Sequence, residues 1–143
     1  MFQDGMKLSG KLTISINDDV VKEVDNLVVT AGKSFVASRM KDTTDAAMSH
    51  MAVGTGSTAA AAGDTALGSE SARVGLSSTS VSSNAITYSA TFAAGTPSSA
   101  AAITEAGLFN ASSAGTMLCR TVFDVVNKGT ADSMTISWVV TVS

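Results

Sequence analysis

Apolar and polar residues alternate along much of the chain, and the clearest alternation begins at residue 7. Apolar residues occupy one parity, and lysine, serine and threonine occupy the other; the apolar set is Leu8, Leu12, Ile14 and Ile16. A period of two is typical of a β-strand with one buried face. The turn-prone residues 17–19 follow, and residues 20–29 are again largely apolar. Residues 7–29 are therefore predicted to form a β-hairpin.

The pattern changes after this hairpin. Thr30 is placed to cap a helix near 31–41, which is predicted to end in the polar residues 42–45. A short apolar strand is predicted over 49–53. Residues 54–70 are rich in glycine, alanine and serine, and this composition predicts a long surface loop.

Alternation returns in the second half, where turns rich in Gly, Ser and Asn separate short apolar runs. The predicted strands cover residues 72–81, 86–92, 103–109, 117–123 and 134–142. Short strands at regular spacing favour a sandwich or barrel, because two sheets must face each other to bury their apolar sides. We predict a mainly-β fold that forms one folding unit. Residues 30–143 would be an antiparallel, jelly-roll-like β-sandwich with the short helix, and residues 1–29 an N-terminal hairpin arm.

Composition narrows the possible functions. The 143 residues suit one domain, and only 15% of them are charged, with a net charge of -3. An acidic balance argues against nucleic-acid binding. No apolar run approaches a membrane span, and residues 1–5 lack the features of a signal peptide, so we expect neither membrane insertion nor export by that route.

The residue types that usually carry chemistry are sparse. His50 is the only histidine and Cys119 the only cysteine, so the usual zinc sites and an intrachain disulfide are not expected. Residues 54–58 look like a phosphate-binding loop but lack its lysine. Cys119 shares the parity of Met117 and Phe123, which predicts a core thiol. We predict no catalytic, cofactor-binding or metal-binding residue and no enzymatic activity.

Glu105 interrupts an apolar strand, between Ile103 and Gly107. A carboxylate at such a position lies at a sheet edge or is paired with a cation. Arg73 and Arg120 are the two candidate partners.

Some of the large apolar residues are candidates for a subunit interface. Phe109 and Trp138 are expected to anchor the core, with a place at an interface as the alternative. The hairpin could also add to a neighbour's sheet. The interface candidates are Leu12, Ile14, Val21, Val24, Phe109 and Trp138.

Several short motifs follow one another in a fixed order. They are 28–33 (VVTAGK), 50–56 (HMAVGTG), 64–70 (DTALGSE) with Arg73, 103–110 (ITEAGLFN) and 115–118 (GTML). This order resembles the tail-collar fibre family and related virion proteins of tailed bacteriophages, over residues 28–143. The resemblance implies a non-enzymatic docking or adaptor module of the virion, assembled in the bacterial cytoplasm. It also implies a homo-oligomer, most simply a trimer, in contact with tail, baseplate or major capsid proteins.

Two other functions remain open at this point. A capsid decoration protein that stabilises the phage head would have the same fold and also act in many copies. A carbohydrate-binding β-sandwich would need an aromatic platform or paired carboxylates, and the chain has one Trp and one Tyr.

Overall fold

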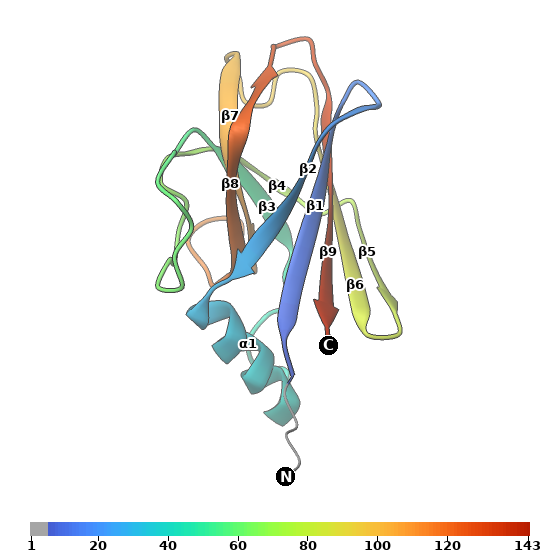
Figure 1. Cartoon of the computed structure of the whole chain (residues 1–143), viewed down its shortest axis with the longest axis vertical. Helices are drawn as coiled ribbons and strands as arrows, with labels where there is room; N and C mark the ends of the chain where they lie inside the picture. The colour runs from blue at the N-terminus through green and yellow to red at the C-terminus, as the bar shows by residue number, and fades with distance from the viewer. Residues whose placement is uncertain (1–5) are drawn as a thin grey trace.

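The computed structural model describes residues 6–143, which contain nine strands and one helix (Figure 1). Most of the strands are joined by short connections, and the longest connection is the predicted loop, at residues 55–69 between β3 and β4. Their bounds are β1 (Leu8–Ile16), β2 (Asp19–Val28), α1 (Thr30–Lys41), β3 (His50–Gly54), β4 (Glu70–Gly75), β5 (Ser78–Ser82), β6 (Ala85–Phe92), β7 (Ala101–Phe109), β8 (Met117–Lys128) and β9 (Met134–Val142).

All nine strands belong to one sheet in the order β4-β3-β7-β8-β2-β1-β9-β6-β5, and its neighbouring strands pair antiparallel. The sheet curls so that its two halves face each other (Figure 1). Only two residue pairs, Leu27 with Arg120 and Val28 with Cys119, join the halves between β2 and β8. The mainly-β prediction is confirmed. The architecture is one curled sheet, or half-barrel, where two separate sheets were expected.

The main core lies on the concave face of this curled sheet. The apolar parity of β1 meets the apolar parity of β9, since Leu12 pairs with Trp138 and Ile14 pairs with Ile136. All four side chains are fully buried. The alternation read from the sequence therefore identified the buried face of both strands correctly.

The N-terminal hairpin is not an appended arm. β1 pairs with β9 from Leu8 to Ile16, and β2 continues into the other half of the sheet through β8. Residues 8–28 thus lie in the middle of the sheet: β1 is paired along both edges, and β2 is joined to β8 through Leu27 and Val28. Alternation shows which face of a strand is buried but not which strands lie beside it, and this is why the predicted boundary between 1–29 and 30–143 fails. Residues 1–5 of the predicted arm lie outside the described residues.

The strand predicted over 72–81 is two strands. β4 and β5 lie at opposite edges of the sheet, and the chain crosses between them at residues 76–77. The Leu76 amide donates to the Ser49 carbonyl, and the Ser77 amide donates to the Ser89 carbonyl. These long-range bonds hold the two ends of the crossing, and no Gly or Pro cluster marks it in the sequence.

The predicted helix near 31–41 is confirmed as α1, which covers one end of the curled sheet (Figure 1). Its N-cap is Val29, and no side chain caps it, so the expected role of Thr30 is not observed. Phe35 is buried in the main core. Gly32 is buried too, and a Cβ at Gly32 would lie 2.1 Å from the carbonyl oxygen of Leu118 on β8. The helix can approach β8 this closely only because residue 32 has no side chain.

We expect Gly32→Ala to lower the free energy of unfolding by about 1–3 kcal/mol, because the new methyl group meets rigid backbone. Gly63→Ala is the matched control, since no atom lies within 4 Å of a Cβ at that position. Urea denaturation of both variants gives the measurement. Equal stability of the two variants would contradict the close contact between α1 and β8.

Candidate functional site: a buried carboxylate beneath the 55–69 loop

Residues 55–69, the loop between β3 and β4, pack on the outer face of the sheet. Leu108 belongs to the main core, whereas its neighbour Phe109 belongs to a second apolar cluster on the opposite face. Leu67 brings the loop into this second cluster, whose buried members are Val29, Ala52, Leu67, Phe109 and Met117. The predicted surface loop is therefore confirmed in position and is anchored to the sheet by its own small core.

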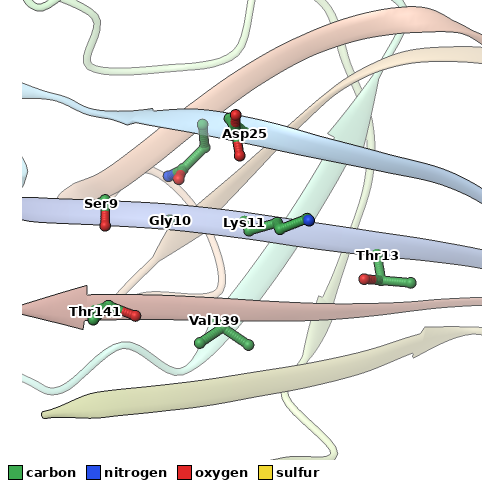
Figure 2. A pocket seen from close by; sticks show the side chains of 8 residues that line it. Ser9, Gly10, Lys11, Thr13, Asp25, Val139 and Thr141 are labelled. Atoms are coloured by element: carbon green, nitrogen blue, oxygen red, sulfur yellow. The ribbon is translucent and has the colours of Figure 1, made fainter.

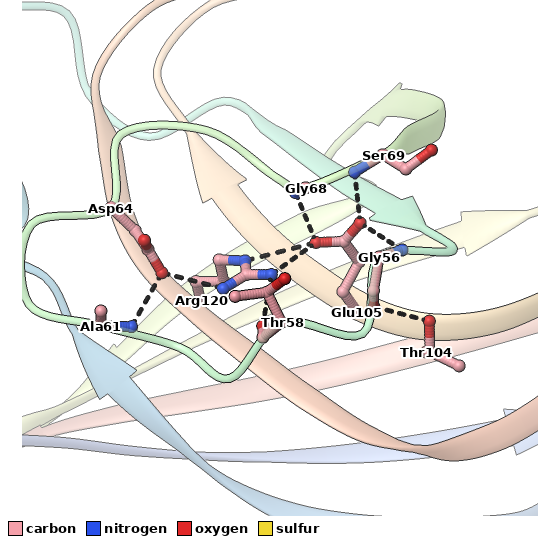
Figure 3. Close-up of polar contacts among 9 residues, drawn as sticks. All are labelled: Gly56, Thr58, Ala61, Asp64, Gly68, Ser69, Thr104, Glu105 and Arg120. Carbon is pink, nitrogen blue, oxygen red and sulfur yellow. Dashed lines mark hydrogen bonds and ion pairs between the residues drawn. The ribbon is translucent and has the colours of Figure 1, made fainter.

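Glu105 of β7 lies under this loop with no exposed surface. Its Oε2 accepts the backbone N–H groups of Gly56 and Ser69, each at 2.7 Å, and its Oε1 accepts that of Gly68 at 2.8 Å (Figure 3). The donors come from both ends of the loop. One carboxylate thus fastens the start and the end of residues 55–69 to β7.

Arg120 of β8 provides the opposite charge and is 2% exposed. Its Nη2 and Nε donate to Glu105 Oε1 at 3.0 and 3.3 Å, and its Nη1 donates to Asp64 Oδ2 at 2.8 Å. Nη2 also donates to the Thr58 carbonyl at 3.0 Å, and Asp64 accepts the Ala61 N–H at 2.8 Å (Figure 3). The guanidinium therefore links the sheet to the middle of the loop.

Glycines make room for the carboxylate. A Cβ at Gly56 would lie 2.4 Å from Glu105 Oε2, and one at Gly54 would lie 2.2 Å from the Ser69 carbonyl oxygen. The segment that superficially resembles a phosphate-binding loop thus wraps around an anion that the chain itself supplies. Its backbone N–H at Gly56 is occupied by Glu105.

The electrostatics keep Glu105 ionised. Burial alone would raise its pKa, but the hydrogen bonds from Gly68, Ser69, Arg120 and Gly56 together outweigh burial and lower it. The pKa of Asp64 is also lowered, chiefly by the Ala61 N–H and further by Arg120. A general acid or base needs access to a substrate and a pKa near the working pH, and Glu105 has neither.

The pairing of Glu105 with Arg120 confirms one of the two alternatives read from the sequence. Arg73, the other candidate, instead binds Glu70 at 2.8 Å and lies over the Phe109 ring, 3.8 Å from its centre. The sequence did not identify Asp64 or the backbone donors. The only signal for them was the spacing of glycines around residues 54–68.

The interface candidates mostly lie inside the chain. Leu12, Ile14 and Trp138 have no exposed surface, and Phe109 is 1% exposed. Val24 packs partly buried against the main core, and only Val21, at 46%, is exposed. The four buried candidates therefore cannot form a docking surface in this conformation, because their side chains are packed inside the protein. The prediction that Phe109 and Trp138 are core anchors is confirmed.

Cys119 and His50 do not form a reactive centre. Cys119 is buried in the main core, as predicted, and burial raises the pKa of its thiol well above its ordinary value. The Nδ1 of His50 shares a 2.8 Å hydrogen bond with the hydroxyl of Ser49. Within residues 6–143, no group of three or more His, Cys, Asp or Glu side chains is placed to hold a metal ion.

A wide hollow lies over β2, β1 and β9, with a volume of about 650 Å³ (Figure 2). Its lining includes Ser9, Lys11 and Thr13 of β1, Asp25 of β2 and Thr141 of β9. These side chains stand along three neighbouring strands and do not converge on one point (Figure 2). Lys11 is exposed, and its Nζ lies 3.7 Å from Glu23. We find no arrangement here that would orient a ligand.

Comparison with known proteins adds no further assignment. No family model, no curated protein and no solved structure matches this chain. In the part of the chain that the structure describes, no helix is both long enough and apolar enough to span a membrane. The functional interpretation therefore depends on the geometry given above and on the sequence motifs.

We expect Glu105→Gln to lower the free energy of unfolding by about 3–5 kcal/mol. The amide group of Gln would face N–H donors, and Arg120 would lose its buried partner. Urea denaturation measures the total effect. Hydrogen exchange at the amides of Gly56, Gly68 and Ser69 should accelerate, because the Gln side chain has only one neutral acceptor oxygen where the carboxylate offers two charged ones.

The matched control is Glu23→Gln, which removes a carboxylate from an exposed pair. Its expected effect is below about 0.5 kcal/mol. Similar losses in the two variants would show that Glu105 does not hold the loop in the way described.

Stability should also depend on pH through this site. The folded pKa of Glu105 is lowered from its ordinary value of 4.5, so the unfolded chain takes up the proton first as pH falls. The stabilisation is fully present above pH 4.5 and is lost as pH falls through the lower folded value. Urea midpoints at pH 7 and about pH 3 should differ less in Glu105→Gln than in the parent chain. An identical pH dependence in both proteins would contradict the assignment.

Proposed function

We propose that this protein is a non-enzymatic structural module of a tailed-phage virion, of the tail-fibre or collar docking type. It would be assembled in the bacterial cytoplasm, act in several copies and contact other virion proteins. The symmetry implied by the family resemblance is a trimer. The proposal is supported by the order of the sequence motifs and by where the structure places those motifs.

The observation that carries the proposal is the convergence of three motifs on Glu105. Residues 50–56 supply the Gly56 amide, residues 64–70 supply Asp64 and the Gly68 and Ser69 amides, and residues 103–110 supply Glu105 itself. Segments far apart in the chain thus form one network around a buried carboxylate. These motifs fix a loop on the sheet, which suits a structural module. In an active site, a carboxylate such as Glu105 would have to be accessible to a substrate.

The structure offers no aromatic platform for carbohydrate binding among the described residues. Trp138 is fully buried and Tyr88 is 7% exposed, so neither ring is free to stack on a sugar. The large exposed apolar side chains of residues 6–143 are Met6, Val20, Val21, Leu27, Met40, Val81 and Val125, none of them aromatic. The geometry therefore favours a structural role over sugar binding.

The proposal is tested by measuring the protein in purified particles of the phage whose genome encodes it. A tail docking module should be present at about a dozen copies per particle, and a decoration protein at a number on the order of hundreds. Quantitative protein staining against the major capsid protein gives the ratio. A band at capsid-like abundance would replace the tail assignment with decoration of the head, and absence from the particles would refute both.

A further inference from the structure

The sheet has two edges, and they are the strands β4 and β5. Each of the other strands lies between two neighbours in the sheet, although β2 and β8 share only two residue pairs. An edge strand presents unpaired backbone N–H and C=O groups, which another chain can use to extend the sheet. The part of β2 that does not pair with β8 carries Lys22, Glu23 and Asp25, and such charges disfavour pairing with another strand, so β4 and β5 are the edges at which a further strand could be added.

β4 is protected in the way natural edge strands commonly are. It carries Glu70 and Arg73, which form an ion pair, and the Arg73 guanidinium also donates to the carbonyls of Ala111 and Ala114. Charged residues on an edge disfavour pairing with another strand, because their desolvation costs free energy. β4 is therefore a poor surface for a second sheet.

β5 has no such protection. All five of its residues are exposed, and its apolar residue Val81 is 71% exposed. The chain contains no charged residue from 74 to 104, and β9, next to β6 in the sheet, is also uncharged. Three neighbouring strands at this edge, β9, β6 and β5, thus carry no charge that would repel an identical copy.

The sequence of β5 is nearly the same in both directions. Ser78-Thr79-Ser80-Val81-Ser82 is a palindrome except that Thr faces Val, and these two β-branched side chains have nearly the same shape. An antiparallel pairing of two copies centred on Ser80 would place Ser78 opposite Ser82 and Thr79 opposite Val81. A two-fold contact requires this kind of self-complementarity.

The apolar face of β5 adds a second reason for a partner. Thr79 and Val81 pair with Tyr88 and Ile86 of β6, so they share the face of the sheet that is turned toward the core. Val81, Ile86 and Tyr88 line an apolar groove of about 230 Å³ that also includes Phe35 of α1. In the antiparallel pairing, Thr79 of a second copy would lie against Val81 and continue this apolar stripe.

We propose that two copies of this chain pair antiparallel through β5, so that the curled sheets continue across a two-fold axis at Ser80. The occupant of the edge is a second copy, because the strand is self-complementary and uncharged. This inference goes beyond the proposed function and does not depend on it. It also departs from the trimer that the family resemblance implies, since a two-fold contact of one surface with itself closes at two copies.

The contact is small, because one short strand and part of a groove contribute to it. Interfaces at the small end of the usual range are weak and reversible. The dimer should therefore form at high protein concentration and dissociate on dilution. Sedimentation velocity over a concentration series up to about 1 mM measures this directly.

The decisive variants place charges on the two-fold axis. Ser80→Lys brings two ammonium groups face to face, and Ser80→Glu brings two carboxylates face to face, so each should weaken self-association about tenfold or more. An equimolar mixture of the two variants should associate again, because Lys then faces Glu. Ser71→Lys, at an exposed serine of the other edge strand β4, is the matched control and should associate like the parent chain.

Each outcome decides the proposal. A dimer that is lost in both Ser80 variants and restored by mixing them supports pairing through β5. A parent chain that stays monomeric up to about 1 mM, a trimer, or a dimer unaffected by Ser80→Lys would overturn it. Circular dichroism checks that the exposed substitutions leave the fold intact. Absence of the protein from virions would refute the proposed function but leave this solution result unchanged.

Discussion

The carboxylate of Glu105 is buried without contact to solvent, and much of the outer layer of the structure follows from that constraint. A buried ion costs several kcal/mol unless an opposite charge and hydrogen bonds replace its lost hydration. Arg120 supplies the charge, and the amides of Gly56, Gly68 and Ser69 supply the hydrogen bonds. These partners can reach one carboxylate only if residues 55–69 lie across β7 and β8, so the ion pair fixes the path of a loop that has no regular structure.

The inner layer depends on a different interaction, the burial of apolar side chains between the halves of one curled sheet. β1 and β9 pair from end to end, which places Leu12 and Trp138 at the centre of the main core. β2 and β8 share only two residue pairs, so the sheet is free to bend at that point. Helix α1 then covers one end of the core, where Gly32 allows it to contact the backbone of β8. Strands β7 and β8 separate the inner core from the outer ionic layer. Some of their side chains, such as Leu108 and Cys119, point into the core, and others, Glu105 and Arg120, form the ion pair on the outer face.

The sequence predicted the elements that depend on local pattern. The alternation around Leu12 and Trp138 identified strands and their buried faces, and an interrupted alternation at Glu105 identified a carboxylate that needed Arg120. Pairing between distant strands has no such local signal. The hairpin was therefore misplaced as an arm, and residues 72–81 were read as one strand although β4 and β5 lie at opposite edges. Backbone donors such as the Gly68 amide leave no trace in residue identity, so the sequence pointed to the ion pair but not to the loop it holds.

The two edge strands of the sheet differ in charge. This difference indicates which edge is available for contacts with another copy of the chain. The edge at β4 contains Glu70 and Arg73 and adjoins the loop held by Glu105, so its polar groups are committed to contacts within the chain. The edge at β5 carries no charge, and β5 pairs with β6 alone in the described sheet. At β4 a second strand would have to displace the contacts that Glu70 and Arg73 already make. At β5 a second strand would form new backbone hydrogen bonds without displacing an ion pair. Contacts with other copies are therefore expected at β5, where pairing satisfies backbone groups without breaking an ion pair.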